Sequence, residues 1–183
     1  MFGVNHTQKY ESDGGPGIDA ILKQLRGSVE AKQDREAFLT AQLLFWMLAA
    51  TDGHAKNFSI QLLPGDEKYR LTPLYDVLSA WPVIGNGAHQ ISYRKAKLAM
   101  AIRSKNRHYH LDEIQRRHWN ALAKRNAMGQ DFEEVIQRVL GQTPKVIDQV
   151  QATLPAGFPA NVAEPILVGL REQAARLEAQ PRA

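Results

Sequence analysis

The sequence of 183 residues contains no cysteine. Disulfide bonds and thiolate metal sites are therefore excluded, and a reducing, cytoplasmic compartment is the natural expectation. Long apolar runs are also missing, because the longest one, from Leu43 to Ala50, is far too short to cross a bilayer. The first residues lack the basic segment and apolar stretch of a signal peptide. Together these absences predict a soluble protein with no membrane partner.

Charge is unevenly distributed along the chain. The net charge is only +4, but residues 94–125 contain ten Lys and Arg residues against two acidic ones, so this basic segment carries +8 and the remainder −4. Such a block attracts nucleic acid, phosphorylated ligands or an acidic partner surface. The alternative is a solvated face that keeps the protein in solution, and charge alone does not separate the two interpretations.

Composition and apolar patterning predict one mainly helical domain over residues 1–183, with two small domains as the alternative. A short helix is expected after the Gly- and Pro-rich loop 12–17, ending at Gly27. From Asp34 to about Ala50 the residues are apolar nearly all round, which is typical of a helix at the centre of a core. Because this helix stops at Thr51-Asp52-Gly53, we expect Asp52 in the interior of the domain.

One small β-hairpin is predicted after that helix. Residues 58–63 and 69–71 read as strands around the turn 64–68. Such a hairpin would separate Asn57 from Asp76 in sequence and return them to one site in space. Beyond a turn at 85–87 the chain looks helical, with candidate helices at 112–128, 131–140, 144–154 and 160–180.

The segment around this hairpin has the layout of a phosphoryl-transfer site. Asp52 is followed five residues later by Asn57, which is the spacing of the protein-kinase catalytic loop H-R-D-x-x-x-x-N. In that loop the Asp accepts the proton of the substrate hydroxyl and the Asn holds a magnesium ion. Asp76 falls where the other magnesium ligand is expected. Taken singly, Asp52 is better explained as a loop residue at a helix end and Asn57 as a strand cap; the joint spacing and the matching flanking residues reverse that preference.

Three ordered motifs resemble one family. They are Lys9–Ile18 (KYESDGGPGI), Ala50–Ser59 (ATDGHAKNFS) and Leu71–Asp76 (LTPLYD), and they resemble the C-terminal domain of HipA-type kinases from about Phe2 to Ala175. HipA-type kinases are the toxins of bacterial persistence toxin–antitoxin systems. The resemblance implies the helical C-terminal lobe of a protein-kinase-like fold, and serine/threonine kinase activity that uses ATP and Mg2+. It also implies a protein substrate such as glutamyl-tRNA synthetase, and a HipB-like helix-turn-helix antitoxin that recruits the toxin to operator DNA.

The resemblance also implies roles for individual residues. Asp52 would be the catalytic base, and Asn57 and Asp76 the magnesium ligands. The residues expected to line the nucleotide are His54, Ala55, Lys56, Asn57, Tyr75 and Asp76, and either Lys56 or His54 would offset charge on the transferred phosphoryl group. Lys124 falls at the position expected to touch operator DNA, and its neighbour Arg125 is included in that tentative nucleic-acid site.

One departure from the family limits these expectations. HipA-type kinases have an N-terminal lobe ahead of the first motif, and no G-x-G-x-x-G nucleotide loop occurs in this sequence. We therefore expect the N-terminal lobe to be absent and the chain alone to have little or no kinase activity. Two other interpretations stay open: a non-catalytic module that binds an antitoxin or DNA, and a small-molecule kinase of related fold.

The remaining aromatic and histidine residues have structural explanations. Trp46, Trp81 and Trp119 are expected to pack in the core, although Trp119 lies among basic residues and a binding surface is its alternative. The run His108-Tyr109-His110 is expected to decorate the surface rather than bind a metal, because no cysteine or carboxylate pair accompanies it.

Overall fold

The computed structural model describes residues 3, 5, 7–65 and 67–182. Met1 and Phe2, at the start of the family resemblance, lie outside the described residues, as does Asp66 in the predicted turn. The α-helices of the described part are α1 (Ile18–Gln24), α2 (Ala31–Met47), α3 (Arg116–Arg125), α4 (Glu133–Thr153) and α5 (Ala160–Glu178). Its strands are β1 (Ile60–Leu62), β2 (Tyr69–Leu71), β3 (Lys97–Arg103) and β4 (Arg107–His110). The mainly helical prediction is confirmed.

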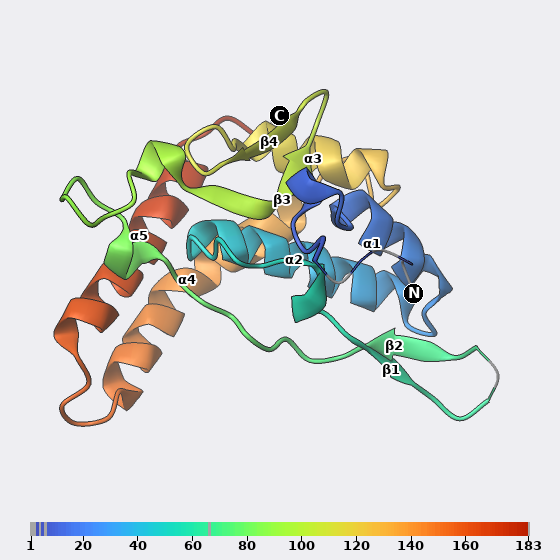
Figure 1. Cartoon of the computed structure of the whole chain (residues 1–183), viewed down its shortest axis with the longest axis horizontal. Helices are drawn as coiled ribbons and strands as arrows, with labels where there is room; N and C mark the ends of the chain where they lie inside the picture. The colour runs from blue at the N-terminus through green and yellow to red at the C-terminus, as the bar shows by residue number, and fades with distance from the viewer. Residues whose placement is uncertain (1–2, 4, 6, 66, 183) are drawn as a thin grey trace.

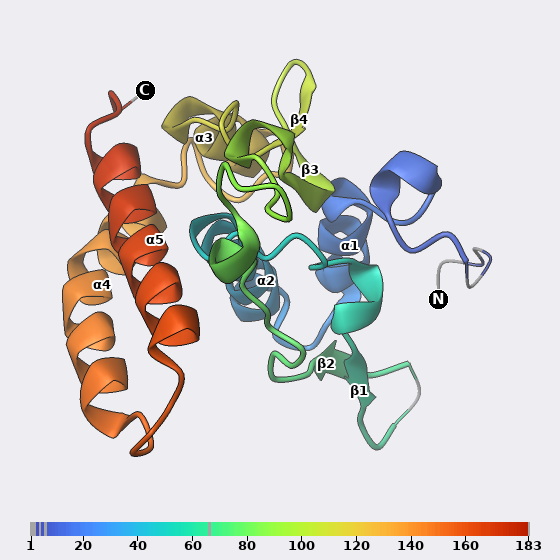
Figure 2. The ribbon, with the colours of Figure 1, turned by 60° about the vertical axis from the view of Figure 1, so that its left-hand side comes forward.

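Helix α2 is the centre of the molecule, and the other elements surround it (Figures 1 and 2). Its predicted apolar character is borne out in its C-terminal part, where every residue from Phe38 to Met47 except Thr40 and Leu44 is buried, while the side that carries Lys32, Gln33 and Ala37 is exposed. Trp46 is fully buried, and its indole nitrogen donates a hydrogen bond of 2.9 Å to the carbonyl oxygen of Leu111. Trp119 is fully buried against it, with ring centroids 6.3 Å apart. Both residues belong to the core, and the half-buried Trp81 packs against that core at its edge, beside Met47 and Gly169.

Two hairpins are present in the described residues, so the prediction of one hairpin is wrong. β1 pairs antiparallel with β2, as predicted, and the pair projects from the molecule beside α1 and α2 (Figures 1 and 2). β3 pairs antiparallel with β4 in a stretch for which no strand was predicted. The five residues Leu98 to Ile102 are all buried, because α3 and the 3-10 turn η1 (Glu11–Asp13) both contact β3. A strand covered on both faces lacks the polar alternation by which strands are usually recognised.

Helix α4 replaces two predicted helices. A break was expected between residues 140 and 144, but α4 continues through Pro144. Val135, Val139, Thr143 and Ile147 form a buried stripe with a spacing of four residues that runs past the proline without interruption. Packing of this stripe offsets the hydrogen bond that Pro144 cannot donate. Tertiary contact has overridden a local helix-breaking signal.

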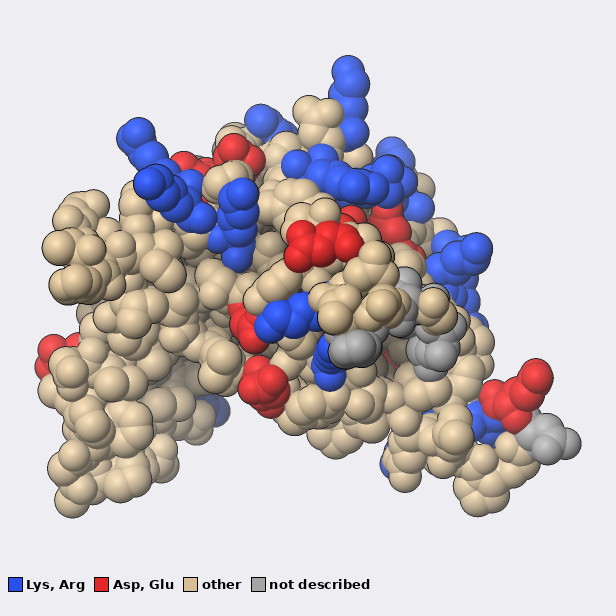
Figure 3. Space-filling view, viewed as in Figure 1, with Lys and Arg blue, Asp and Glu red and all other residues tan. Residues whose placement is uncertain are grey.

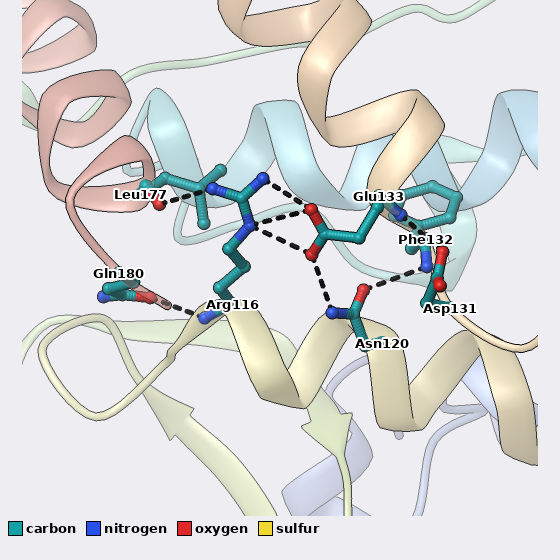
Figure 4. Close-up of polar contacts among 7 residues, drawn as sticks. All are labelled: Arg116, Asn120, Asp131, Phe132, Glu133, Leu177 and Gln180. Carbon is teal, nitrogen blue, oxygen red and sulfur yellow. Dashed lines mark hydrogen bonds and ion pairs between the residues drawn. The ribbon is translucent and has the colours of Figure 1, made fainter. Parts of the chain in front are cut away.

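Polar contacts join the three C-terminal helices at one end (Figure 4). The guanidinium of Arg116, at the start of α3, pairs with Glu133 at the start of α4 and donates to the carbonyl oxygen of Leu177 in α5. Asn120 donates to Glu133 and accepts the backbone N–H of Phe132. Because every member is hydrogen-bonded, this buried network fixes the relative positions of the helices.

His108 lies against a buried histidine. The ring of His108 stacks on that of the buried His118, with centroids 3.8 Å apart, so the expected purely surface position is wrong for His108.

No helix in the described part of the chain is long and apolar enough to span a membrane.

Candidate active site

The loop after α2 positions Asp52. Helix α2 ends at Met47, and Ala49 adopts a left-handed conformation with φ of 51°, which turns the chain back. Gly53 lies on the ring of Phe45 so closely that a Cβ atom has no room there. The backbone is thereby held against the core while the Asp52 side chain is directed outward. Its side chain is 39% exposed, so the expected interior position is wrong and the carboxylate is accessible to a substrate.

One oxygen of Asp52 receives two hydrogen bonds from the first family motif. The hydroxyl of Tyr10 donates to Oδ1 at 2.6 Å, and the ammonium of Lys9 donates to the same atom at 3.1 Å. His54 Nε2 lies 3.7 Å from that oxygen, and its ring packs edge-on against Tyr10. Asp52 is therefore the meeting point of two segments that are more than 40 residues apart in sequence.

The same contacts shift the pKa values of both Asp52 and Lys9 toward their charged forms. Tyr10 first, and then Lys9 and His54, lower the pKa of Asp52 below its ordinary value, against a smaller opposing effect of burial. Hydrogen bonding to Tyr10 and to Asp52 raises the pKa of Lys9. Asp52 is thus held as a carboxylate and Lys9 as an ammonium at neutral pH.

Asn57 brings the two predicted magnesium ligands together. It is 3% exposed; its Oδ1 accepts the backbone N–H of His54 at 3.0 Å, and its Nδ2 donates to Oδ2 of Asp76. Asp76 itself has a left-handed backbone with φ of 55°, a conformation that Asp tolerates better than most residues and that often occurs at functional sites. The predicted return of Asp76 to Asn57 across the β1–β2 hairpin is what the structure shows.

The donor set of these two residues fits magnesium. The carboxylate of Asp76 and the amide oxygen of Asn57 are hard oxygen ligands, and Asp76 is exposed. Because Oδ1 of Asn57 already accepts one hydrogen bond, only its second lone pair is left for a cation. Two protein ligands of this kind leave the rest of an octahedral shell to phosphate and water.

Tyr75, Lys56 and Ser59 form a second small cluster beside the first. The Tyr75 hydroxyl donates to the carbonyl oxygen of Lys56 at 2.9 Å and contacts the Ser59 hydroxyl at 2.7 Å. Tyr75 remains 42% exposed, so one side of its ring faces solvent. Next to this cluster is a hollow of about 310 Å³, lined mainly by apolar side chains, to which Ala55 and Ser59 contribute.

Comparisons with known proteins place the chain in a family. The model of the HipA-like C-terminal domain matches residues 1–147, which is most of the chain. The chain belongs to this family. A chain in the complex of the Shewanella oneidensis MR-1 toxin–antitoxin system HipA, HipB and its operator DNA has a similar fold, with a TM-score of 0.79 at 18% identity. That likeness covers 97% of this HipA-like chain but only 42% of the other one, so this chain spans less than half of its length.

The tentative nucleic-acid residues of this HipA-like domain lie in the last turn of α3. Lys124 and Arg125 are exposed at the end of α3, but Arg125 Nε is 3.0 Å from the Asp19 carboxylate. Within the basic segment Arg116 is buried and paired, and Arg103 also contacts Asp19. Lys and Arg side chains gather along one edge of the molecule, above β3 and β4 in Figure 3. The face that is free to attract an anionic partner is therefore smaller than the sequence count suggested.

Two residues at the centre of the site were missed from the sequence. Lys9 and Tyr10 were noted as part of the first motif, but no role was predicted for them. The position of that motif ahead of the loop that carries Asp52 could have indicated proximity, but nothing in its spacing points to Asp52. Ser59 belongs to the second motif, and no role was predicted for it either.

Proposed function

We propose that this chain is the catalytic lobe of a HipA-type serine/threonine protein kinase, which transfers the terminal phosphoryl group of ATP to a protein hydroxyl with Mg2+. Membership of the HipA-like C-terminal domain family supports this assignment. The observation that carries it is the position of Asn57, whose single amide holds both the catalytic loop, through His54, and Asp76 from beyond the hairpin. This links the two proposed metal ligands to the loop that carries Asp52.

In the proposed reaction the side chains mainly position groups and neutralise charge, as phosphoryl transfer requires. Asp52 orients the acceptor hydroxyl and takes its proton. Asn57 and Asp76 would hold magnesium, which neutralises charge on the phosphate oxygens when bound. Tyr75, Ala55 and the half-exposed hollow beside them supply a surface for the nucleotide, and His54 and Lys56 complete the lining.

Activity is expected to require more than this chain. The matched HipA–HipB–DNA complex contains a chain of which only 42% is covered here. Clamping of the nucleotide from the opposite side is needed to exclude water and pre-organise the transition state. A HipA-like N-terminal lobe supplied in trans is therefore expected to raise a low basal activity toward a protein substrate, for which glutamyl-tRNA synthetase is the first candidate.

Isothermal titration of the chain with ATP and magnesium tests the proposal. Asp76→Asn should abolish or greatly weaken binding, because it removes the anionic ligand while an amide oxygen can still accept the hydrogen bond from Asn57. Asp148→Asn is the matched control, since Asp148 is exposed on α4 away from the site. Binding that is equal in wild type and Asp76→Asn would contradict a nucleotide site at these residues. Absence of wild-type binding in the presence of an added N-terminal lobe would contradict the kinase assignment itself.

A non-catalytic module that binds an antitoxin or DNA is the second candidate. The basic edge in Figure 3 and the HipB–operator complex of the structural neighbour favour it. Lys124→Glu should weaken binding to operator DNA or to a HipB-like antitoxin on DNA and reduce its salt dependence. Because Arg125 is already paired with Asp19, Lys124 is the cleaner position, with exposed Lys145→Glu on α4 as control. Unchanged binding in Lys124→Glu would leave this edge as a solvated face.

A further inference from the structure

The segment that carries Lys9 and Tyr10 is firmly anchored. The Glu11 carboxylate accepts the backbone N–H of Ala101 in β3 at 2.8 Å. The backbone N–H of Gly15 donates to the carbonyl oxygen of Tyr10 at 2.9 Å, and a Cβ atom at Gly15 would lie only 2.8 Å from that same oxygen. The glycines of the first motif therefore allow a tight turn that fixes the two residues against Asp52. Such anchoring is typical of a group whose position matters for chemistry.

The two contacts from this segment make the two oxygens of the Asp52 carboxylate different from each other. Lys9 and Tyr10 both donate to Oδ1. In the part of the chain that the structure describes, no side chain hydrogen-bonds to Oδ2. The second oxygen is therefore the one that can accept a proton from a hydroxyl group.

Lys9 is also the cation that touches the catalytic carboxylate. The sequence predicted that Lys56 or His54 would offset phosphoryl charge. However, Nε2 of the buried His54 lies 3.7 Å from Oδ1, beyond hydrogen-bond distance. Lys9 Nζ is 3.1 Å from Oδ1, with its side chain 37% exposed, so it faces both the carboxylate and the open site.

We propose that Lys9 and Tyr10 complete the catalytic centre: both hold Oδ1 of Asp52 so that Oδ2 faces the acceptor hydroxyl, and Lys9 contacts the phosphoryl group as it is transferred. This inference rests on the proposed kinase function. Tyr10 is a positioning residue, since it acts through Asp52. Lys9 is a catalytic residue, since it touches the reacting phosphate.

The proposed step balances in atoms and charge. The acceptor oxygen forms a bond to the terminal phosphorus of ATP, the bond from that phosphorus to the bridging oxygen breaks, and ADP leaves with the bonding electron pair. The hydroxyl proton moves to Oδ2 of Asp52 and from there to solvent. Lys9, which faces both Asp52 and the open site, contacts the terminal phosphate of bound ATP, and this contact strengthens when Asp52 becomes neutral during transfer.

The first arm of the test is independent of nucleotide and of activity. The carboxyl carbon of Asp52 is titrated by NMR in wild type, Tyr10→Phe and Lys9→Met, with its signal assigned through Asp52→Asn. We expect the pKa of Asp52 to rise in both variants, and more in Tyr10→Phe. Lys23→Met, an exposed lysine of α1, should leave it unchanged. An Asp52 carboxyl that titrates identically in wild type, Tyr10→Phe and Lys9→Met would overturn the shared hold on Oδ1.

The second arm separates a phosphate contact from a merely structural role. Affinities for magnesium–ATP and magnesium–ADP are measured by isothermal titration. Lys9→Met should weaken ATP binding about tenfold, the effect of one hydrogen bond between charged groups, with little change for ADP. Lys9→Arg should restore part of the difference, and Lys23→Met should alter neither affinity.

The possible failures are distinguishable. Equal weakening of ATP and ADP in Lys9→Met, or weakening of neither, would overturn the phosphate contact while leaving the nucleotide site in place. A wild-type chain that binds neither nucleotide even with a HipA-like N-terminal lobe added would contradict the proposed function and the phosphate contact of Lys9 with it. In that case the carboxyl titration still decides whether Lys9 and Tyr10 hold Asp52.

Discussion

Arg116 and Glu133 form an ion pair with Nη2 and Oε2 2.5 Å apart, although Arg116 is only 1% exposed (Figure 4). The arginine also donates to the carbonyl oxygen of Leu177, so one guanidinium connects the starts of α3 and α4 with the end of α5. The Glu133 pKa is lowered, primarily by its hydrogen bonds from Arg116. This pair fixes how the helical half of the molecule is assembled.

Breaking this pair on one side should be costly. Arg116→Met leaves the Glu133 carboxylate without its partner in a largely buried position, and we expect the free energy of unfolding to fall by about 3 kcal/mol. Urea denaturation followed by circular dichroism measures it. The adjacent Arg117→Met, at an exposed position, should stay within about 0.5 kcal/mol of wild type. If the double variant Arg116→Met/Glu133→Met were less stable than Arg116→Met alone, an uncompensated charge would not be the cause of the loss.

Replacing Gly53 or Gly141 by alanine should change the stability of the protein in opposite directions. Gly53→Ala places a methyl group against the ring of Phe45, where there is no room, and should lower stability by about 1–3 kcal/mol. Gly141 lies inside α4 with open space around it, so Gly141→Ala should raise stability by about 0.5–1 kcal/mol. Thermal unfolding of both variants checks the pair of signs. A neutral Gly53→Ala would mean that Phe45 moves aside freely and that the loop of Asp52 is not held by the core.

His118 should make the protein sensitive to mild acid. Burial, followed by His108 and Arg117, lowers the pKa of His118 to about 4. Because the unfolded imidazole titrates near 6.5, its stabilising contribution is complete above pH 6.5 and is lost as the pH falls toward 4, by up to about 3 kcal/mol. The measurement is the unfolding free energy between pH 4 and 8 for wild type and His118→Gln, whose difference should shrink as the pH falls. Gln substitution of the exposed His89 is the control for replacing a histidine as such. A constant difference for His118→Gln would rule out this titration.

Substitutions of Asp76 should distinguish an effect on nucleotide binding from an effect on the stability of the fold. Asn tolerates the left-handed backbone of this position, so Asp76→Asn should unfold within about 0.5 kcal/mol of wild type while losing the carboxylate of the proposed metal ligand. Asp76→Ala meets the steric cost of that conformation and should lose about 1–2 kcal/mol. Urea denaturation of the two variants compares them. If Asp76→Asn were as destabilised as Asp76→Ala, its effect on nucleotide binding could not be assigned to the carboxylate.

The sequence was informative where signals were local. A largely apolar helix and a hairpin bounded by Pro64 and Gly65 are both short-range patterns, and α2 and the β1–β2 pair are found where they were expected. The strands within residues 97–110 were not predicted, and the reason is physical. The run Leu98-Ala-Met-Ala-Ile102 has only one β-branched residue and no alternation of apolar and polar residues. Such an apolar run does not distinguish a helix from a strand that is buried on both faces.

The site was predicted in part for the same reason. Asp52, Asn57 and Asp76 lie within one short stretch, and their spacing around a hairpin brings Asn57 and Asp76 together. The contact of Lys9 and Tyr10 with Asp52 spans more than 40 residues and depends on how the first motif is anchored to β3. Contacts of that kind arise from tertiary packing, and no local pattern encodes them.

The dual bond of Asn57 gives the molecule a built-in reporter. Its Oδ1 accepts the N–H of His54, while its Nδ2 holds Asp76. Because this N–H also donates to the carbonyl oxygen of Asp52 at 2.9 Å, it exchanges with solvent deuterium only when both bonds open, and opening of the bond to Asn57 loosens the loop that holds Asp76. Hydrogen exchange at this one backbone position should follow the opening and closing of the proposed metal site, and its slowing on addition of magnesium and nucleotide would be visible before any turnover.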